Sequence, residues 1–326
     1  MEVIKPFVKW AGGKGSLISQ LTNFYPFELE NGTIKKYVEP FVGGGAVLID
    51  ILQKYDVEEA YAFDINKDLI NCYNVIKKDV ETLIEKLNEK EKEFLNIELE
   101  NRQEYFYKIR SEYNSYKIED NLDVKRASEF IFLNRTCFNG LYRVNKNGEF
   151  NVPCGKYKNP TICDAKNLRN LSKLLQNVVF EYGDYKKCIK YIDTNTFVYF
   201  DPPYRPLSIT SGFTSYTKED FNDENQKELA DFYKELDLKK AAVVVKEKSI
   251  EMIKSKDLLP LTGYIHGGCS PVGMKKYFPT VIDKSAKNQE RIIFSGGKIG
   301  YQIDTTLEEL AKVINYTLED ITKDKI

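Results

Sequence analysis

The stretch Thr196-Phe-Val-Tyr-Phe-Asp-Pro-Pro-Tyr204 decides how the rest of this chain is interpreted. It begins as an apolar run rich in β-forming residues, which is typical of a buried parallel strand. Prolines lock φ and lack an N–H group, so the turn that follows offers carbonyl oxygens and the Asp201 carboxylate as acceptors. Rigid acceptors beside the Tyr204 ring suit the exocyclic amino group of a planar heterocycle. The alternative is a strand that simply ends in a proline turn.

Composition excludes several classes of protein. A chain of 326 residues with 42% hydrophobic residues is long enough for one large or two medium domains. The net charge of −1 gives no global attraction to nucleic acid, so any such binding needs a local patch. The six cysteines form no C-x-x-C pair and His266 is the sole histidine, which argues against a metal site and a disulfide framework. No apolar run of about 18 residues and no signal peptide is visible, so we expect a soluble, cytoplasmic protein with no membrane partner.

A glycine turn lies close to the N-terminus, in Lys9-Trp-Ala-Gly-Gly-Lys14. A phosphate-binding P-loop would need a further glycine where Val8 stands, so that interpretation fails. What remains is a turn that can place the Trp10 ring and the Lys14 cation against a ligand.

A second glycine turn follows in Tyr37-Val-Glu-Pro-Phe-Val-Gly-Gly-Gly45, between a short predicted strand and a helical run. Glycines there let the backbone approach a ligand closely. The dinucleotide fingerprint would need glycine in place of Leu48, which disfavours NAD. A second strand ends at Asp64, at the spacing from which a carboxylate binds ribose hydroxyls. The two features favour a nucleoside-containing cofactor, although a structural turn is the simpler alternative.

Five motifs in this order resemble the Dam-type DNA adenine-N6 methyltransferases, over about residues 5–235. They are Lys9-Trp-Ala-Gly-Gly-Lys14, Phe41-Val-Gly-Gly-Gly45, Asp64-Ile-Asn66, Asn134-Arg-Thr-Cys-Phe-Asn-Gly-Leu-Tyr-Arg143 with Gly148-Glu-Phe-Asn-Val-Pro153, and Asp201-Pro-Pro-Tyr204 with Arg205-Pro-Leu-Ser-Ile-Thr-Ser-Gly-Phe-Thr214. The resemblance implies an α/β, doubly wound Rossmann-like core with an inserted helical and hairpin target-recognition region at about 75–160. It also implies S-adenosylmethionine as cofactor and duplex DNA as partner.

The resemblance carries site residues over position by position. Catalysis falls to Asp201, Pro202 and Tyr204. The positions that match the family's cofactor site are Trp10, Lys14, Phe41, Gly43, Gly45, Asp64 and Asp201. Asp184 stands at the end of another apolar run and is included with them as a candidate cofactor-binding residue.

The D-P-P-Y motif permits a specific reaction. The lone pair of adenine N6 is delocalised into the ring, so the nitrogen is a poor nucleophile. Asp201 and the Pro202 carbonyl can accept its two hydrogens and draw it toward tetrahedral geometry, with the lone pair aimed at a sulfonium methyl. Tyr204 would stack on the base, which must leave the duplex to reach the site.

Two segments between these motifs differ in character. Residues 77–125 are dense in Lys and Glu with apolar positions at helical spacing, which predicts solvated helices. Residues 134–160 set five basic residues and four aromatics against a single acid, Glu149, which suits a hairpin laid on DNA; a plain surface hairpin is the alternative. By the resemblance this segment recognises the target, which in the family is typically GATC, in a restriction-modification or housekeeping role. The DNA-contacting positions are then Lys9, Phe138, Asn139, Leu141 and Arg143.

The family pattern stops at about residue 235. From there the chain resembles the C-terminal half of the YbaK/EbsC-type aminoacyl-tRNA deacylases, and the essential lysine of that family has no counterpart. The matching stretches include 258–276, 278–283 and 292–303, with Gly267, Gly268 and Asp283 at pocket positions. The sequence thus predicts a methyltransferase domain at 1–235 and a partial deacylase-like segment at 236–326. Because the methyltransferase pattern stops before the family's final strands, the methyltransferase sheet would keep an open edge. Two other functions stay open: a deacylase that edits mischarged tRNA(Pro), with tRNA as partner, and an inactive DNA-binding fusion remnant.

Overall fold

The chain divides into two compact units, residues 1–226 and 227–325. The structure, a computed structural model, describes residues 3–118, 122–193, 195–203, 221–244, 246 and 250–321. The helix α9 (Asp223–Val244) spans the boundary between the units. Among the described residues, none of the helices is both long and apolar enough to cross a membrane.

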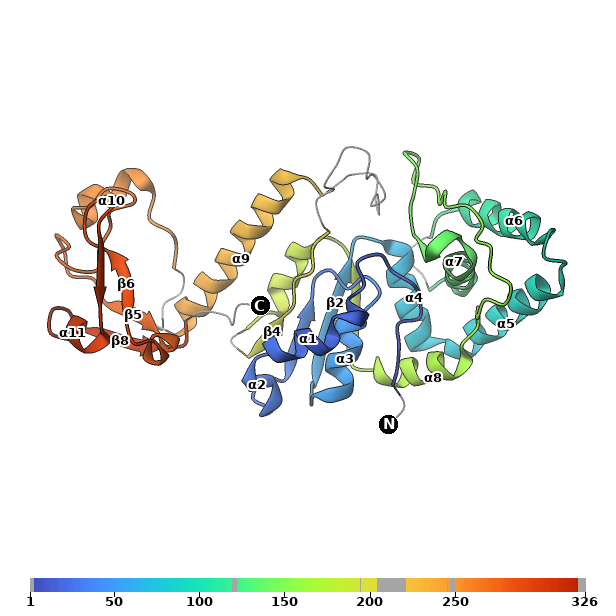
Figure 1. Ribbon diagram of the computed structural model, residues 1–326, viewed down its shortest axis with the longest axis horizontal. Coiled ribbons are helices and arrows are strands. Elements are labelled where there is room, and N and C mark those ends of the chain that lie inside the picture. The colour runs from blue at the N-terminus through green and yellow to red at the C-terminus, as the bar shows by residue number, and fades with distance from the viewer. Residues whose placement is uncertain are drawn as a thin grey trace. The chain divides into compact units, whose positions relative to one another are not determined.

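The first unit is built on a parallel four-stranded sheet (Figure 1). Its order is β3-β2-β1-β4, with β1 (Lys36–Glu39), β2 (Glu59–Asp64), β3 (Val178–Tyr182) and β4 (Thr196–Val198). The predicted strands are confirmed, and so is the mixed α/β class with a parallel sheet. One further hydrogen bond extends the pairing of β4 with β1, from the Tyr199 N–H to the Val38 carbonyl at 3.0 Å. Among the described residues, β4 pairs with β1 alone and forms one edge of this sheet.

Helices cover one face of the sheet. The helices α3 (Ala46–Lys54) and α4 (Lys67–Lys78) follow β1 and β2, and the Asn66 side chain caps α4 by accepting the Leu69 N–H at 3.0 Å. Tyr73 of α4 stacks on Phe180 of β3, with 4.5 Å between ring centroids. The helix α8 (Ala165–Leu174) packs beside α4 on the way to β3.

The opposite face of the sheet is covered by the 3₁₀ helix η4 (Tyr185–Tyr191). Its Tyr191 stacks on Tyr61 of β2 at 3.9 Å. Since successive side chains of a strand point to opposite faces, Tyr61 lies on the other side of the sheet from Ala62, the register partner of Phe180. Helical elements therefore cover both faces of the parallel sheet.

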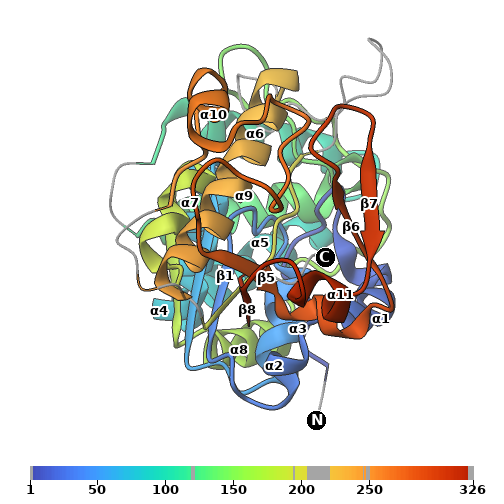
Figure 2. The same ribbon diagram turned by 90° about the vertical axis from the view of Figure 1, so that its left-hand side faces the viewer.

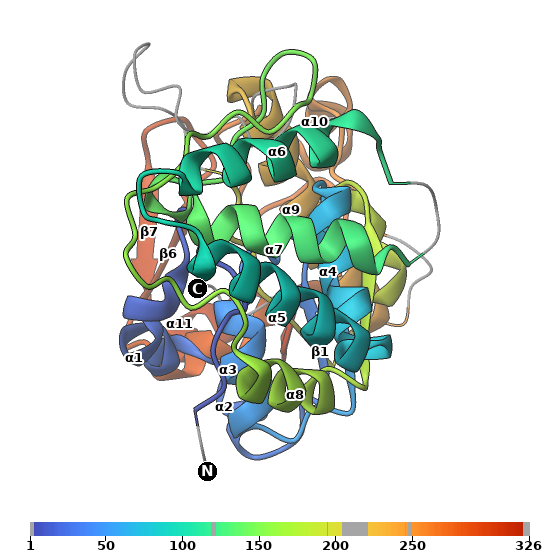
Figure 3. The same ribbon diagram turned by 90° about the vertical axis from the view of Figure 1, so that its right-hand side faces the viewer.

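Between α4 and α8 the chain forms three α-helices that lie side by side (Figure 3). They are α5 (Val80–Asn96), α6 (Arg102–Ser115) and α7 (Val124–Thr136). The first two expose their charged faces, whereas α7 is buried between them and α4. After α7 comes the short η3 (Phe138–Gly140). Two antiparallel backbone β-bridges, one pairing Cys137 with Cys154 and the other Val144 with Phe150, then form a hairpin, called the 137–155 hairpin below.

Four short helical turns lead from the N-terminus to the sheet. They are η1 (Lys14–Ser16), α1 (Ile18–Leu21), η2 (Thr22–Phe24) and α2 (Phe27–Glu30).

The second unit holds two separate strand pairs (Figure 2). One is parallel, β5 (Thr280–Asp283) with β8 (Tyr316–Glu319), and the other antiparallel, β6 (Ile292–Ser295) with β7 (Gln302–Thr305). Its helices after α9 are α10 (Ser255–Thr262), η5 (Lys284–Asn288) and α11 (Leu307–Ala311). Of the described apolar side chains in 250–321, Leu310 alone is fully buried, so these strands share no continuous core.

Candidate active site

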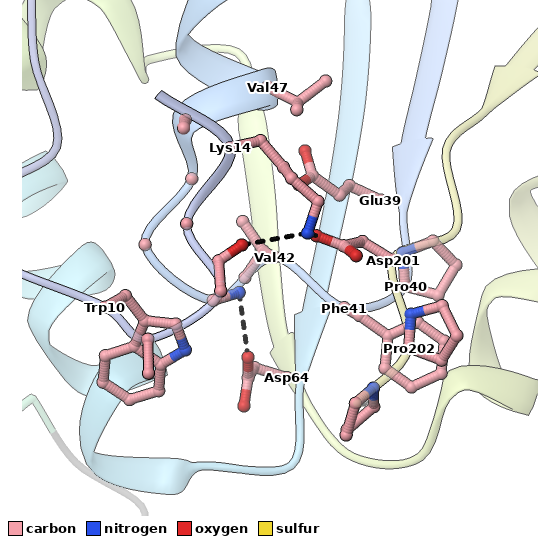
Figure 4. Close-up of a pocket in the computed structure, with 18 of the residues that line it drawn as sticks. Trp10, Lys14, Glu39, Pro40, Phe41, Val42, Val47, Asp64, Asp201 and Pro202 are labelled. Atoms are coloured by element: carbon pink, nitrogen blue, oxygen red, sulfur yellow. Dashed lines mark hydrogen bonds and ion pairs between the residues drawn. The ribbon is translucent and has the colours of Figure 1, made fainter. Parts of the chain in front are cut away.

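A cavity of about 460 Å³ opens where the four parallel strands end. The carboxyl ends of parallel strands meet at one edge, and between β1 and β4 the order of the sheet reverses, which is where α/β proteins bind ligands. Figure 4 shows the side chains that converge there. Nine of the residues predicted for cofactor binding or catalysis line this cavity: Trp10, Lys14, Phe41, Gly43, Gly45, Asp64, Asp184, Asp201 and Pro202. Tyr204 and the motif at 205–214 lie outside the described residues.

The turn after β1 requires glycine, because neighbouring side chains lie very close to its backbone. Gly43 and Gly45 have φ of 45° and 71°, a region that favours glycine. A Cβ atom on Gly43 would lie 2.9 Å from the Trp10 ring, and one on Gly45 would lie 2.4 Å from the Tyr73 hydroxyl. The turn therefore packs its backbone directly against Trp10 in the cavity wall.

Asp64 fixes this glycine turn from β2. Its Oδ2 accepts the Gly43 N–H at 3.0 Å and its Oδ1 accepts the Asn66 N–H at 2.8 Å. Burial raises the pKa of Asp64 to about 6, against the effect of these backbone donors. Because each carboxylate oxygen has two lone pairs, the same oxygens can still accept hydrogen bonds from a ligand.

An ion pair joins the N-terminal turn to the D-P-P-Y motif (Figure 4). Lys14 Nζ lies 2.5 Å from Asp201 Oδ2 and also donates to the Gly12 carbonyl at 2.9 Å. The Lys14 side chain is 10% exposed and the Asp201 side chain 22%, so water screens the pair only partly. The lysine holds the Asp201 carboxylate in one place at the edge of the cavity.

Glu39 is a cavity residue that sequence analysis missed. It ends β1, is 3% exposed, and its Oε2 accepts the Tyr37 hydroxyl at 2.8 Å. Burial raises the pKa of Glu39 to about 8, assisted by the nearby Asp201 and opposed by the Tyr37 hydroxyl. The signal was present in the sequence, because Glu39 ends a buried strand as Asp64 does.

Glu39 should make stability fall as pH rises. A carboxyl whose pKa is higher in the folded protein than in the unfolded chain binds a proton more tightly when folded, so its contribution is present below about pH 4.5 and is lost as pH rises to about 8. We expect Glu39→Gln, a mimic of the protonated form, to gain stability relative to the wild type over this range, by about 1 kcal/mol or more. Urea unfolding at pH 5 and pH 8 measures the difference.

Glu28, an exposed glutamate of α2, provides the control. The Glu28→Gln variant should follow the wild-type pH profile. A Glu39→Gln variant that also follows it would show that the buried carboxyl does not titrate in this window.

The 137–155 hairpin carries four of the five residues predicted to contact DNA. Phe138 is 51% exposed, and Asn139 beside it has a left-handed backbone, with φ of 55°. Leu141 packs partly against the core. Arg143 is anchored across the hairpin, where its Nε donates to Asn151 Oδ1 at 2.7 Å.

The fifth predicted residue, Lys9, lies against the same hairpin although it is far away in the sequence. A Cβ atom on Gly140 would lie 2.4 Å from its side chain, and its Nζ sits 4.6 Å from the centre of the Tyr157 ring. The structure thus places Lys9 against Gly140 of the 137–155 hairpin, which carries the other four residues.

This fold and cavity define an α/β protein whose candidate ligand site lies at the carboxyl edge of a parallel sheet. A family model described as D12 class N6 adenine-specific DNA methyltransferase matches residues 10–260, and the chain belongs to this family. A second family model, the aminoacyl-tRNA editing domain, matches residues 230–313. Both matches confirm the resemblances predicted from the motifs.

Similar proteins agree with the first match. The chain is 55% identical over 242 residues to a type II methyltransferase, M.MjaIII, of Methanocaldococcus jannaschii, which covers 74% of this chain and 83% of that protein. It is 37% identical over 231 residues to a DNA adenine methylase of Escherichia coli K12, covering 71% and 76%. A DNA adenine methylase of Haemophilus influenzae is 32% identical over 296 residues, covering 90% and 94%.

Proposed function

We propose that this protein transfers a methyl group from S-adenosylmethionine to adenine N6 in duplex DNA, at GATC sites, in the cytoplasm. The observation that carries the proposal is that Trp10, Asp64, Lys14 and Asp201 line one cavity. Trp10 in its wall stacks on Tyr142 of the 137–155 hairpin. The type II name of M.MjaIII favours a role in restriction-modification.

The chemistry of the cavity fits this cofactor. Its volume of about 460 Å³ is in the range of small-molecule sites. The rings of Trp10 and Phe41 provide apolar surface, and the carboxylates Asp64, Asp184 and Asp201 suit ribose hydroxyls and cationic groups. When bound, the cofactor supplies an activated methyl on a sulfonium.

In the proposed reaction the D-P-P-Y turn prepares the adenine. The Asp201 carboxylate and the Pro202 carbonyl would accept hydrogen bonds from the two N6 hydrogens, so that the nitrogen lone pair could attack the methyl in line as the carbon–sulfur bond breaks. The methylated nitrogen would then release one of its protons to solvent. Lys14 keeps the carboxylate at its position through the ion pair at 2.5 Å. The flipped base would stack on Tyr204, which lies outside the described residues.

Transfer of labelled methyl from S-adenosylmethionine to a GATC duplex tests the function. We expect incorporation into GATC and background levels on a duplex in which its adenine is already N6-methylated. No incorporation at high protein concentration would refute the activity. Binding of GATC without transfer would instead favour a non-catalytic DNA-binding protein.

The editing-domain match at residues 230–313 favours a second candidate, hydrolysis of mischarged tRNA. Since this segment corresponds to one half of a deacylase and lacks a counterpart of its lysine, we expect only background hydrolysis of cysteinyl-tRNA(Pro). Faster hydrolysis would reverse the ranking of the two candidates.

Arg143 and Lys146 should contribute differently to DNA binding. The bond from Arg143 Nε to Asn151 fixes the guanidinium plane, whose Nη groups can bridge guanine O6 and N7. We expect Arg143→Ala to relax the preference for GATC over single-base variants by about 1–3 kcal/mol. The exposed Lys146 lies in the turn between Asn145 and Gly148, so Lys146→Ala should weaken all duplexes about equally and flatten the salt dependence.

Methylation of a panel of GATC variants at two salt concentrations distinguishes the two roles. Equal losses on every sequence for both variants would mean that Arg143 contacts the DNA backbone rather than a base.

A further inference from the structure

We propose that Tyr142 is a positioning residue that couples cofactor binding to recognition of the DNA sequence. This inference rests on the proposed function. Tyr142 stands between Leu141 and Arg143, the two residues proposed to read base edges, yet its own side chain is 7% exposed. It therefore packs inward from the DNA-reading strand of the hairpin.

The Tyr142 ring packs against the wall of the cavity. It stacks on Trp10 with 5.6 Å between ring centroids and 22° between planes. The centroid of the Phe130 ring of α7 lies 5.3 Å from that of Tyr142. Trp10 also lies over Phe130, at 6.4 Å and 28°. Because Trp10 lines the cavity, this stack is a direct mechanical link from the cofactor site to the hairpin.

The backbone is fastened around this stack. Lys9 N–H donates to Asn134 Oδ1 and the Lys9 carbonyl accepts from Asn134 Nδ2, both at 2.8 Å. The same Nδ2 donates to the Gly140 carbonyl at 3.0 Å. Arg135 adds two bonds from Nε and Nη2 to the Phe7 carbonyl, at 3.1 and 2.9 Å. The turn that carries Trp10 and the base of the hairpin must therefore move together.

Two ligands that contact opposite ends of one stack, and that favour the same arrangement of it, strengthen each other's binding. A cofactor held against Trp10 restricts the stack, and DNA held by Leu141 and Arg143 restricts it from the other end. A ligand that orders a shared element lowers the entropy cost of ordering it for the next ligand. Coupling between sites typically changes affinity about 5- to 150-fold, and it is reciprocal.

The test measures the affinity for S-adenosylhomocysteine, the product form that cannot transfer a methyl, with and without a saturating GATC duplex. Trp10 is the single tryptophan of the chain, so its fluorescence reports on the stack itself. In the wild type we expect the duplex to tighten binding about 10-fold. The Tyr142→Phe variant, which keeps the ring, should retain most of this coupling. Tyr142→Leu and Tyr142→Ala should reduce it to less than about twofold.

Two further measurements separate coupling from general damage. The duplex alone should change Trp10 emission in the wild type and in Tyr142→Phe, but not in Tyr142→Leu. Tyr105→Ala removes a ring that packs on Phe94 and Phe132 of the same helical region, and it should retain the coupling.

The outcomes test the role of Tyr142 separately from the proposed methyltransferase function. Full coupling in Tyr142→Leu, or binding of both ligands by the wild type with no coupling, would overturn the role of Tyr142 and leave the proposed function intact. A wild-type protein that binds no S-adenosylhomocysteine would overturn both.

Discussion

Replacing Asp201 by alanine should lower the rate of methyl transfer by at least about 100- to 1,000-fold, because it removes an acceptor aimed at the reacting nitrogen. The substitution also removes the partner of Lys14, whose side chain is 10% exposed and pairs with Asp201 at 2.5 Å. Asp201→Asn keeps the volume and one acceptor oxygen but loses the charge. Its rate should therefore lie between those of the wild type and of Asp201→Ala. Single-turnover transfer to a GATC duplex measures this effect apart from product release.

The neighbouring Asp184 provides a matched control. It lines the same cavity and its side chain accepts the Lys186 N–H at 2.8 Å, but it follows β3 instead of β4. Asp184→Ala should raise the KM for the cofactor and leave the single-turnover rate at saturation within about tenfold of the wild type. Transfer by Asp201→Ala at a comparable rate would refute the proposed role of the D-P-P-Y carboxylate.

Asp68→Ala should destabilise the first unit by about 3–5 kcal/mol, because it leaves a buried guanidinium without its counter-ion. Arg126 is 5% exposed and meets Asp68 in two parallel bonds, Nε to Oδ1 at 2.8 Å and Nη2 to Oδ2 at 3.0 Å. The Tyr113 hydroxyl also donates to Asp68 Oδ2, at 2.6 Å. Arg126 Nη1 donates to the Tyr116 carbonyl at 2.7 Å, so the network ties α4, α6 and α7 together. Denaturant unfolding measures the loss.

An exposed pair with the same geometry shows what burial contributes. Arg169 also makes two bonds to a carboxylate, Nε to Glu81 Oε1 at 2.8 Å and Nη2 to Oε2 at 2.7 Å. Both side chains are about half exposed, at 49% and 60%. Because water screens this pair, Glu81→Ala should cost much less stability than Asp68→Ala. Equal losses from Asp68→Ala and Glu81→Ala would mean that the buried network is not what holds these helices together.

Local patterns in the sequence were enough to predict the parallel sheet and the edge at which the site lies. Each strand is a short apolar run, and Asp64, Asp184 and Asp201 stand where such a run ends. Because strand periodicity and turn chemistry are properties of neighbouring residues, the sequence states them directly. The same reasoning would have found Glu39, had the acid at the end of β1 been considered alongside the others.

The contacts that bring these residues together in one candidate site were decided by tertiary structure alone. Lys14 reaches Asp201 and Tyr142 reaches Trp10 across long stretches of chain, and no spacing in the sequence encodes either contact. The raised pKa of Glu39 likewise depends on how completely the surrounding elements exclude water. Long-range packing depends on the fit of many side chains at once, and a local pattern carries no information about that fit.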